Sequence, residues 1–245
     1  MSDLLTIRAN QRTIARDRPT AIPDGTDAAS PFRGDRYGGQ HVSAISNKEL
    51  FAADEGSYYV GISATPGTGI IGHAAPTTFD ETKPYLLVYN GGTNRIYPQI
   101  LKFHETVVST AATRCQWTFT IDDGNRLSSA GTAVTVNNGN MASSNASGAV
   151  IKQGAPVATA ASGSRRVLGH FVVRSTIDVV EDNLTFVFGD PSAGQDSVAP
   201  ATVMNMTVAL PPVVIGPGQS FMAYQWSASQ STGPTLEVVF GFIER

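Results

Sequence analysis

The chain has 245 residues, of which 41% are hydrophobic and 15% charged, and its formal net charge is −3. This length can bury a sizeable core, and all-β chains of this size commonly form one domain. The slightly acidic balance excludes the strong positive field that attracts proteins to nucleic acid or anionic membranes, so we expect neither as a direct partner.

The N-terminal residues carry no basic segment followed by an apolar run, which is the pattern of a secretion signal. No stretch reaches the roughly 18 apolar residues of a membrane span. We therefore expect a protein that is made in a cytoplasm and has no membrane anchor.

Residues 1–55 differ in composition from the rest of the chain. Arginines are interleaved with prolines and glycines, large apolar residues are few, and no hydrophobic period is sustained. Such a segment cannot bury itself independently. We predict an extended N-terminal arm over residues 1–55, in which 4–14 could form a short helical or extended piece, and one sandwich domain over residues 56–245.

From residue 57 on, the chain shows short runs rich in Val, Ile, Tyr, Phe and Thr, separated by turn clusters such as Asn90-Gly91-Gly92. Such runs predict β-strands. The expected strands span residues 57–63, 85–90, 95–108, 114–121, 133–136, 149–153, 166–174, 184–188, 201–208, 220–227 and 235–243.

These strands predict an all-β fold. No window shows a helical apolar stripe, and strands do not alternate with helices, which disfavours a Rossmann or barrel enzyme fold. An antiparallel β-sandwich of about eight to ten strands, jelly-roll-like, fits best, and an immunoglobulin-like sandwich is the alternative. Residues 128–164 are rich in Ser, Ala, Gly and Asn, and predict a long loop or loose hairpin at one end.

The segment Gly67-Thr68-Gly69-Ile70-Ile71-Gly72 matches the G-x-G-x-x-G pattern of dinucleotide-binding loops. In those sites a helix follows, and its N-terminus faces the pyrophosphate, whereas here Pro76 interrupts any helix. The segment therefore predicts a glycine-rich turn with a strand, and no cofactor.

The sequence predicts no metal site. The cluster Asp122-Asp123-Gly124-Asn125 has the oxygen ligands that calcium prefers, but it follows a predicted strand, where Asx residues and Gly form turns. Cys115 is the only cysteine and shares a strand face with Trp117 and Phe119, so we expect a buried side chain rather than a reactive thiol. The histidines show no metal-ligand spacing. They are His41, His73, His104 and His170.

No catalytic residues can be assigned either. The acidic pairs Asp54-Glu55, Asp80-Glu81 and Glu181-Asp182 are predicted to be solvated loop acids rather than paired catalytic carboxylates. The aromatic residues leave two alternatives, because most lie in predicted strands and form core or subunit interface, while exposed rings could stack on sugars. They are Tyr58, Tyr59, Tyr85, Tyr89, Tyr97, Tyr224 and Trp226.

The segment Ala53-Asp54-Glu55-Gly56-Ser57-Tyr58-Tyr59-Val60, followed by Thr65-Pro66-Gly67-Thr68-Gly69, resembles a poorly characterised family of tailed-bacteriophage virion proteins. The resemblance extends to Arg36-Tyr37-Gly38, Arg95-Ile96-Tyr97-Pro98, residues 162–165 and the endings 214–218 and 241–245. It implies a virion component without fixing its place in the particle, and it brings no catalytic, cofactor-binding or metal-binding residues.

A compact sandwich with an arm that becomes ordered on its neighbours suits a protein that decorates a shell. We expect a capsid cement or decoration protein, not an enzyme, that binds the major capsid protein and forms a closed dimer or trimer. It would be made in the host cytoplasm and end in the virion. The alternative is a tail or head-fibre module that binds host glycans, with exposed aromatics and acids at one end of the sandwich. A glycan-active enzyme would need two converging carboxylates.

Overall fold

The computed structural model describes residues 33–34, 40–41, 48–63, 65–73, 78–108, 115–159, 164–174, 180–190, 205–226 and 234–245. The chain divides into two compact units, Met1–Lys48 and Glu49–Arg245. In the first unit, strands β1 (Arg33–Gly34) and β2 (Gln40–His41) pair antiparallel. The expected helical or extended piece at residues 4–14 lies outside the described residues.

The second unit begins within helix α2 (Lys48–Asp54), which the sequence interpretation did not anticipate within residues 1–55. Its C-terminus is closed by two hydrogen bonds, from Ser57 N to Ala52 O (2.8 Å) and from Gly56 N to Ala53 O (2.9 Å). Gly56 has a φ of +71°, the left-handed conformation that this type of helix ending requires. Since Ala52 is fully buried, α2 packs into the second unit.

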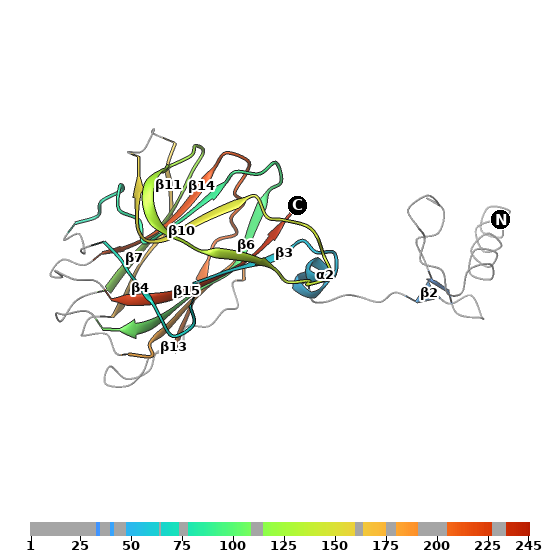
Figure 1. Ribbon diagram of the computed structural model, residues 1–245, viewed down its shortest axis with the longest axis horizontal. Helices are drawn as coiled ribbons and strands as arrows, with labels where there is room; N and C mark the ends of the chain where they lie inside the picture. Colours follow the sequence, from blue (N-terminus) through green and yellow to red (C-terminus); the bar gives the residue numbers. More distant parts are fainter. Residues whose placement is uncertain are drawn as a thin grey trace, which may run out of the picture. The chain divides into compact units, whose positions relative to one another are not determined.

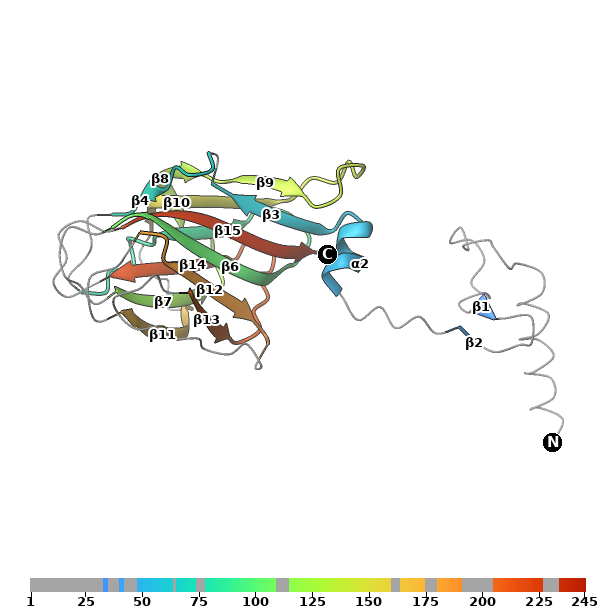
Figure 2. The same cartoon turned by 90° about the horizontal axis from the view of Figure 1, so that it is seen from below.

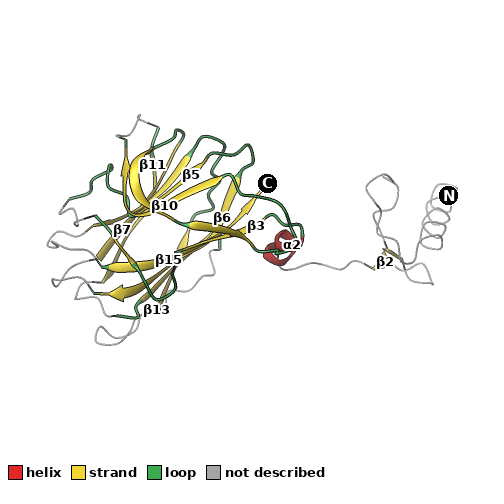
Figure 3. Ribbon diagram, viewed as in Figure 1, coloured by secondary structure: helices red, strands yellow, loops and turns green. Residues whose placement is uncertain are grey.

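The remaining elements of the second unit are strands, which form two sheets (Figures 1 and 3). The six-stranded sheet has the order β11-β7-β14-β5-β10-β8, and the seven-stranded sheet has the order β13-β12-β6-β15-β3-β9, with β4 paired to β15. The strands are β3 (Tyr58–Ile62), β4 (Ile70–Ile71), β5 (Leu86–Asn90), β6 (Ile96–Val107), β7 (Cys115–Asp122), β8 (Leu127–Ala133), β9 (Thr135–Asn138), β10 (Ala149–Ala158), β11 (Arg166–Arg174), β12 (Asn183–Phe188), β13 (Asn205–Leu210), β14 (Ser220–Trp226) and β15 (Thr235–Glu244).

The predicted antiparallel β-sandwich is confirmed. The chain crosses from the six-stranded sheet to the seven-stranded sheet after β5, returns after β6, and crosses again after β14. Within the six-stranded sheet, β14 lies between β5 and β7. Such crossings between facing sheets are those of a β-sandwich. One pair departs from the antiparallel pattern, because β12 and β13 run parallel.

The core lies between the two sheets and is rich in aromatic side chains. Trp117 of β7 stacks on Phe103 of β6, with ring centroids 4.3 Å apart, and Phe119 of β7 contacts Phe186 of β12 at 4.6 Å. All four are fully buried, and burying each apolar side chain of this size contributes about 1.5–3 kcal/mol. The sandwich is thus stabilised by aromatic side chains that alternate along both sheets.

The predicted loop over residues 128–164 is wrong, because most of this segment forms β8, β9 and β10. Strand β8 is an edge strand with a largely exposed face and pairs with β10 through its backbone. Small polar side chains therefore suffice there, and no apolar alternation marks the strand in the sequence.

Among the described residues, no helix is long and apolar enough to cross a membrane.

Candidate functional site

The glycine-rich segment forms a turn and a strand, as predicted. Gly67 has a φ of +81° in a turn that Thr68 N closes by donating to Thr65 O (3.1 Å). Strand β4 then follows and pairs with β15. A strand thus occupies the position where a dinucleotide site requires the N-terminus of a helix.

The three histidines of the second unit have separate partners. His73 approaches the carbonyl oxygen of Pro156 (2.7 Å), and His104 lies near Glu181 (3.3 Å). His170 stacks on Trp226 (5.4 Å between ring centroids). His41 belongs to the first unit, and the described residues contain no group of three or more His, Cys, Asp or Glu placed to hold a metal ion. The structure describes the backbone of Cys115 but not its side chain.

The segment from Asp122 to Asn125 forms the predicted turn, between β7 and β8. Its backbone is held by two Asx contacts, since Asp122 Oδ1 accepts from Gly124 N (3.1 Å) and Asn125 Oδ1 accepts from Leu127 N (2.9 Å). Asp122 also forms an ion pair with Arg126 (2.8 Å), and both side chains are almost fully buried. The sequence interpretation missed this pair.

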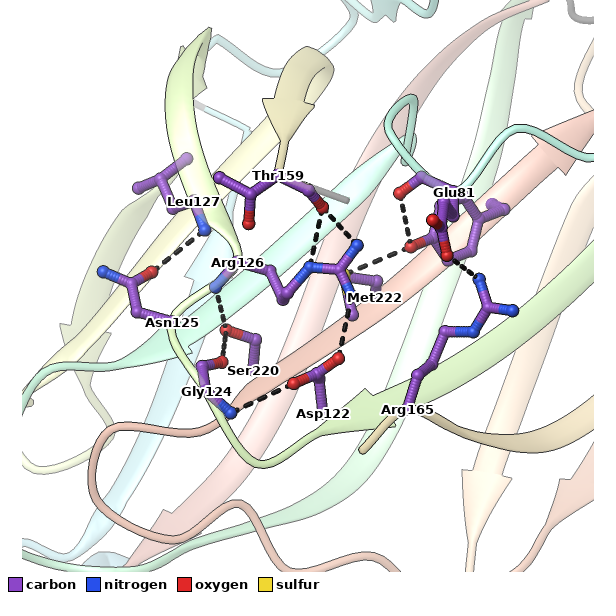
Figure 4. A network of polar contacts seen from close by, with 11 residues as sticks. Glu81, Asp122, Gly124, Asn125, Arg126, Leu127, Thr159, Arg165, Ser220 and Met222 are labelled. Carbon is purple, nitrogen blue, oxygen red and sulfur yellow. Dashed lines mark hydrogen bonds and ion pairs between the residues drawn. The ribbon is translucent and has the colours of Figure 1, made fainter. Parts of the chain in front are cut away.

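Arg126 is the centre of a polar network that joins three strands (Figure 4). Its guanidinium donates through Nε to Thr159 O (2.8 Å), just beyond β10, while its backbone N donates to Ser220 Oγ (2.9 Å) at the start of β14. Ser220 Oγ in turn donates to Gly124 O (2.8 Å). The network fixes the β7–β8 turn, and its charges are already paired, so its role is structural.

Beside this network lies a hollow of about 540 Å³ with a mainly polar lining. Arg165 at its wall forms an ion pair with Glu81, as Figure 4 shows, and its guanidinium lies over the ring of Phe79 (5.3 Å). The lining residues are Ile121, Asp122, Asp123, Ser164, Arg165, Arg166, Val214 and Gln219. None of the described residues that line this hollow is aromatic.

The acidic pair Glu181-Asp182 is not a solvated loop pair, because Asp182 is only 3% exposed. Its carbonyl oxygen accepts from Glu105 N (2.9 Å), and Glu105 O accepts from Glu181 N (2.9 Å). Glu105 is also buried. Backbone hydrogen bonds therefore join Glu105 of β6 to Glu181 and Asp182, which precede β12. The sequence did not indicate this contact.

The aromatic residues that the sequence left as either core or sugar-stacking candidates are mostly buried or partly buried. Tyr59, Tyr85 and Tyr224 are buried, and burial raises the pKa of Tyr224 to about 12. The hydroxyl of Tyr85 donates to Leu236 O (3.1 Å) across the two sheets. The core alternative is confirmed for these three tyrosines.

A further functional candidate is the outer face of the seven-stranded sheet, which Figure 2 shows with β6, β12 and β15. On β12, on most of β6 and on the first half of β15, buried residues alternate with half-buried residues that point outward, whereas residues 240–244 of β15 are all buried. We define the outer face by seventeen residues on β3, β6, β12, β13 and β15 that lie on the side of the sheet away from the core, of which Gly241 and Ile243 are themselves buried. They are Tyr58, Val60, Ile62, Tyr97, Ile100, Lys102, His104, Asn183, Thr185, Val187, Asn205, Thr207, Ala209, Glu237, Val239, Gly241 and Ile243.

The register arranges the outer face in rows that run across the strands. A polar row joins Asn205, Asn183, His104 and Glu237, and a mixed row joins Thr207, Thr185, Lys102, Val239 and Ile62. The next row, Ala209, Val187, Ile100, Gly241 and Val60, is entirely apolar, and the last joins Tyr97, Ile243 and Tyr58. The face is therefore polar in its first row, mixed in its second and largely apolar in its third and fourth.

The outer face also contains a small hollow of about 180 Å³ between β3, β6 and β15. Ile62 and Val239 form part of its wall, together with the side chains of Lys102 and His104. At its rim, Glu237 accepts a hydrogen bond from the backbone N of Gly67.

The outer surface of the six-stranded sheet is covered differently. A second apolar cluster there contains Met222 and Tyr224, and Phe79, from the segment before β5, packs on it. The Phe79 ring lies 4.9 Å from the Tyr224 ring and 6.4 Å from the Trp226 ring. The chain thus covers part of this sheet with its own segment, while four valines elsewhere on the same sheet are exposed. They are Val150, Val157, Val167 and Val172.

Comparisons of this chain with protein-family models, with curated proteins and with solved structures find no match.

Proposed function

We propose that this chain is a structural virion protein of a tailed bacteriophage, a cement or decoration protein that binds and stabilises the major capsid shell. The observation that supports an assembly role is the outer face, a broad sheet surface with an entirely apolar row and few charges. Of its apolar side chains, Ile62 is 38% exposed, Ile243 is buried and the others are half-buried. Apolar surface that a chain leaves uncovered can mark an interaction surface in soluble proteins. The bacteriophage assignment is supported by the resemblance over residues 53–60 and 65–69.

In this proposal the protein has no catalytic step, cofactor or metal. Residues 1–55 and one sandwich edge contact neighbouring capsid subunits, and each contact is weak. Many copies acting together make the shell resistant to internal pressure, because linked weak contacts add up to a high overall affinity. The protein is made in the host cytoplasm and is retained in the finished particle.

The copy number in purified particles tests this role. Quantitative mass spectrometry against the major capsid protein is expected to find hundreds of copies per particle. A value of about six or twelve would instead indicate a portal or tail position, in keeping with ring symmetry. Absence of the protein from purified particles would refute a structural role.

One observation favours a second candidate, a tail or head-fibre module that binds host glycans. The hollow of about 540 Å³ offers Asp123, Arg166 and Gln219, side chains that can form hydrogen bonds with sugar hydroxyls. If this candidate is correct, Arg166→Ala lowers binding of the protein to host-cell glycans in an array experiment, while Lys152→Ala on β10 leaves it unchanged. Equal binding by both variants would dismiss the hollow as the glycan site.

A further inference from the structure

We propose that the outer face packs against the outer face of a second copy, and that the protein is a two-fold symmetric dimer with four stacked sheets. This inference rests on the structural role proposed above and names the partner of the exposed sheet. It follows from the size of the face, its charge and the order of its rows.

The outer face has the area that a stable dimer requires. Its five strands contain between 5 and 12 residues each. With a rise of ~3.3 Å per residue and a strand spacing of ~4.8 Å, they cover on the order of 600 Å² in projection. Standard interfaces bury about 800 Å² of accessible surface on each partner, and accessible surface exceeds projected area.

The charge of the outer face is complementary to itself. Among its residues, Lys102 is the one formal cation and Glu237 the one formal anion at pH 7, and they lie in adjacent rows on neighbouring strands. A strongly charged partner would require a face of opposite net charge, which this face does not provide. A second copy requires only that each Lys102 lie near the other copy's Glu237.

One two-fold axis places matching rows against each other and also brings opposite charges together. The seven-stranded sheet has β6 and β15 at the middle of its strand order. A two-fold axis parallel to the strands and between β6 and β15 places each row on the same row of the second copy. The apolar row then covers itself, β6 covers β15, and the long side chain of Lys102 reaches the second copy's Glu237. Sheets stacked in this way are nearly aligned, as in ordinary sandwiches.

The oligomeric mass of the full chain tests the dimer directly. Light scattering coupled to size-exclusion chromatography is expected to give twice the chain mass of 25.8 kDa. Val187→Glu, which places a charge in the apolar row, is expected to give a monomer with an unchanged circular dichroism spectrum. Val167→Glu is the matched control, since Val167 is 58% exposed on the other sheet, and it is expected to remain a dimer.

A cross-linking experiment on the unmodified chain avoids any effect of substitutions on folding. A carbodiimide joins an amine to a nearby carboxylate, so a covalent dimer containing the Lys102–Glu237 peptide pair is expected. Lys102→Arg keeps the positive charge and the dimer mass, but it should lose this cross-link.

A monomer at about 100 µM, or a dimer that survives Val187→Glu, would overturn the proposed dimer. Either result leaves the structural role to be decided by the copy number in particles. Conversely, a dimer that is absent from virions would support this interface and refute the proposed function.

Discussion

The ion pair between Asp122 and Arg126 is the residue contact with the largest expected effect on stability. The two side chains are 0% and 2% exposed, so removal of one partner leaves a charge without compensation in the interior. We expect Arg126→Met to lower the free energy of unfolding by about 3–5 kcal/mol, as measured by urea denaturation. Lys83→Met removes the partner of Asp80 in a largely exposed pair and is expected to cost less than about 1 kcal/mol.

A double variant separates the lost charge pairing from lost packing. Asp122→Asn combined with Arg126→Met removes both charges, and it should be more stable than Arg126→Met alone. If the double variant were less stable than either single variant, the buried charge would not be the cause.

The buried tyrosines make stability depend on alkaline pH. Burial raises the pKa of Tyr224 to about 12, and it also raises the pKa of Tyr85 above its usual value. In the unfolded chain tyrosine ionises near pH 10, so the unfolded state loses its proton first as the pH rises. The stabilisation by Tyr224 is therefore complete below pH 10 and is lost between about pH 10 and 12, at about 1.4 kcal/mol per pH unit.

Denaturation with urea between pH 9 and 11.5 measures this slope. Tyr224→Phe removes the ionising group and should reduce the fall in the free energy of unfolding over this range. An identical slope in the variant would show that Tyr224 does not contribute to the alkaline loss of stability.

At the scale of elements, Gly154 allows β10 to approach β4. It has a φ of +90°, and a Cβ atom at this position would lie 2.5 Å from Ile70 Cγ2 and 2.9 Å from Ile71 O. We expect Gly154→Ala to lower the free energy of unfolding by about 2–4 kcal/mol, since it combines backbone strain with overpacking.

Gly218 provides the matched control for this substitution. It has a similar φ of +77°, but no atom lies within 4 Å of its added Cβ position. Gly218→Ala is therefore expected to cost only the backbone strain, about 1–2 kcal/mol in the same denaturation experiment. Equal losses for the two variants would show that close packing at Gly154 has no role.

The elements differ in how well the sequence predicts them, and burial explains the difference. Strands such as β5 and β15 place Val, Leu and Phe in the core, so their composition identifies them. The edge strand β8 has the sequence LSSAGTA and depends on backbone pairing to β10, which local composition does not encode. Helix α2 has seven residues, too few for a helical apolar period to be recognised.

At the scale of the whole molecule, the outer face could not be found from the sequence alone. Its rows combine residues as distant as Val60 and Ala209, and the sheet order that aligns them depends on non-local pairing. The outward positions of β6 and β15 could be identified from alternation, but not which of them would be neighbours. The buried pair Asp122–Arg126 was missed for a related reason, because the turn between β7 and β8 determines where Arg126 points.

Truncation at the N-terminus tests whether α2 belongs to the sandwich unit. Deletion of residues 2–47 removes the first unit up to the start of α2, and it should leave the melting temperature nearly unchanged. Deletion of residues 2–56 also removes buried Ala52 and the ion pair of Glu55 with Arg245. We expect this longer deletion to lower the stability by about 2 kcal/mol, which is about 4–8 °C in melting temperature for a chain of this size.

The same pair of deletions separates folding from assembly. If residues 1–47 serve contacts with the shell, the shorter deletion should remain folded and soluble yet fail to bind particles that lack the protein. Binding is measured by adding purified protein to such particles and separating them by sedimentation. A folded short deletion that still binds at the full level would place the shell contacts on the sandwich, because no residue before α2 would then be required.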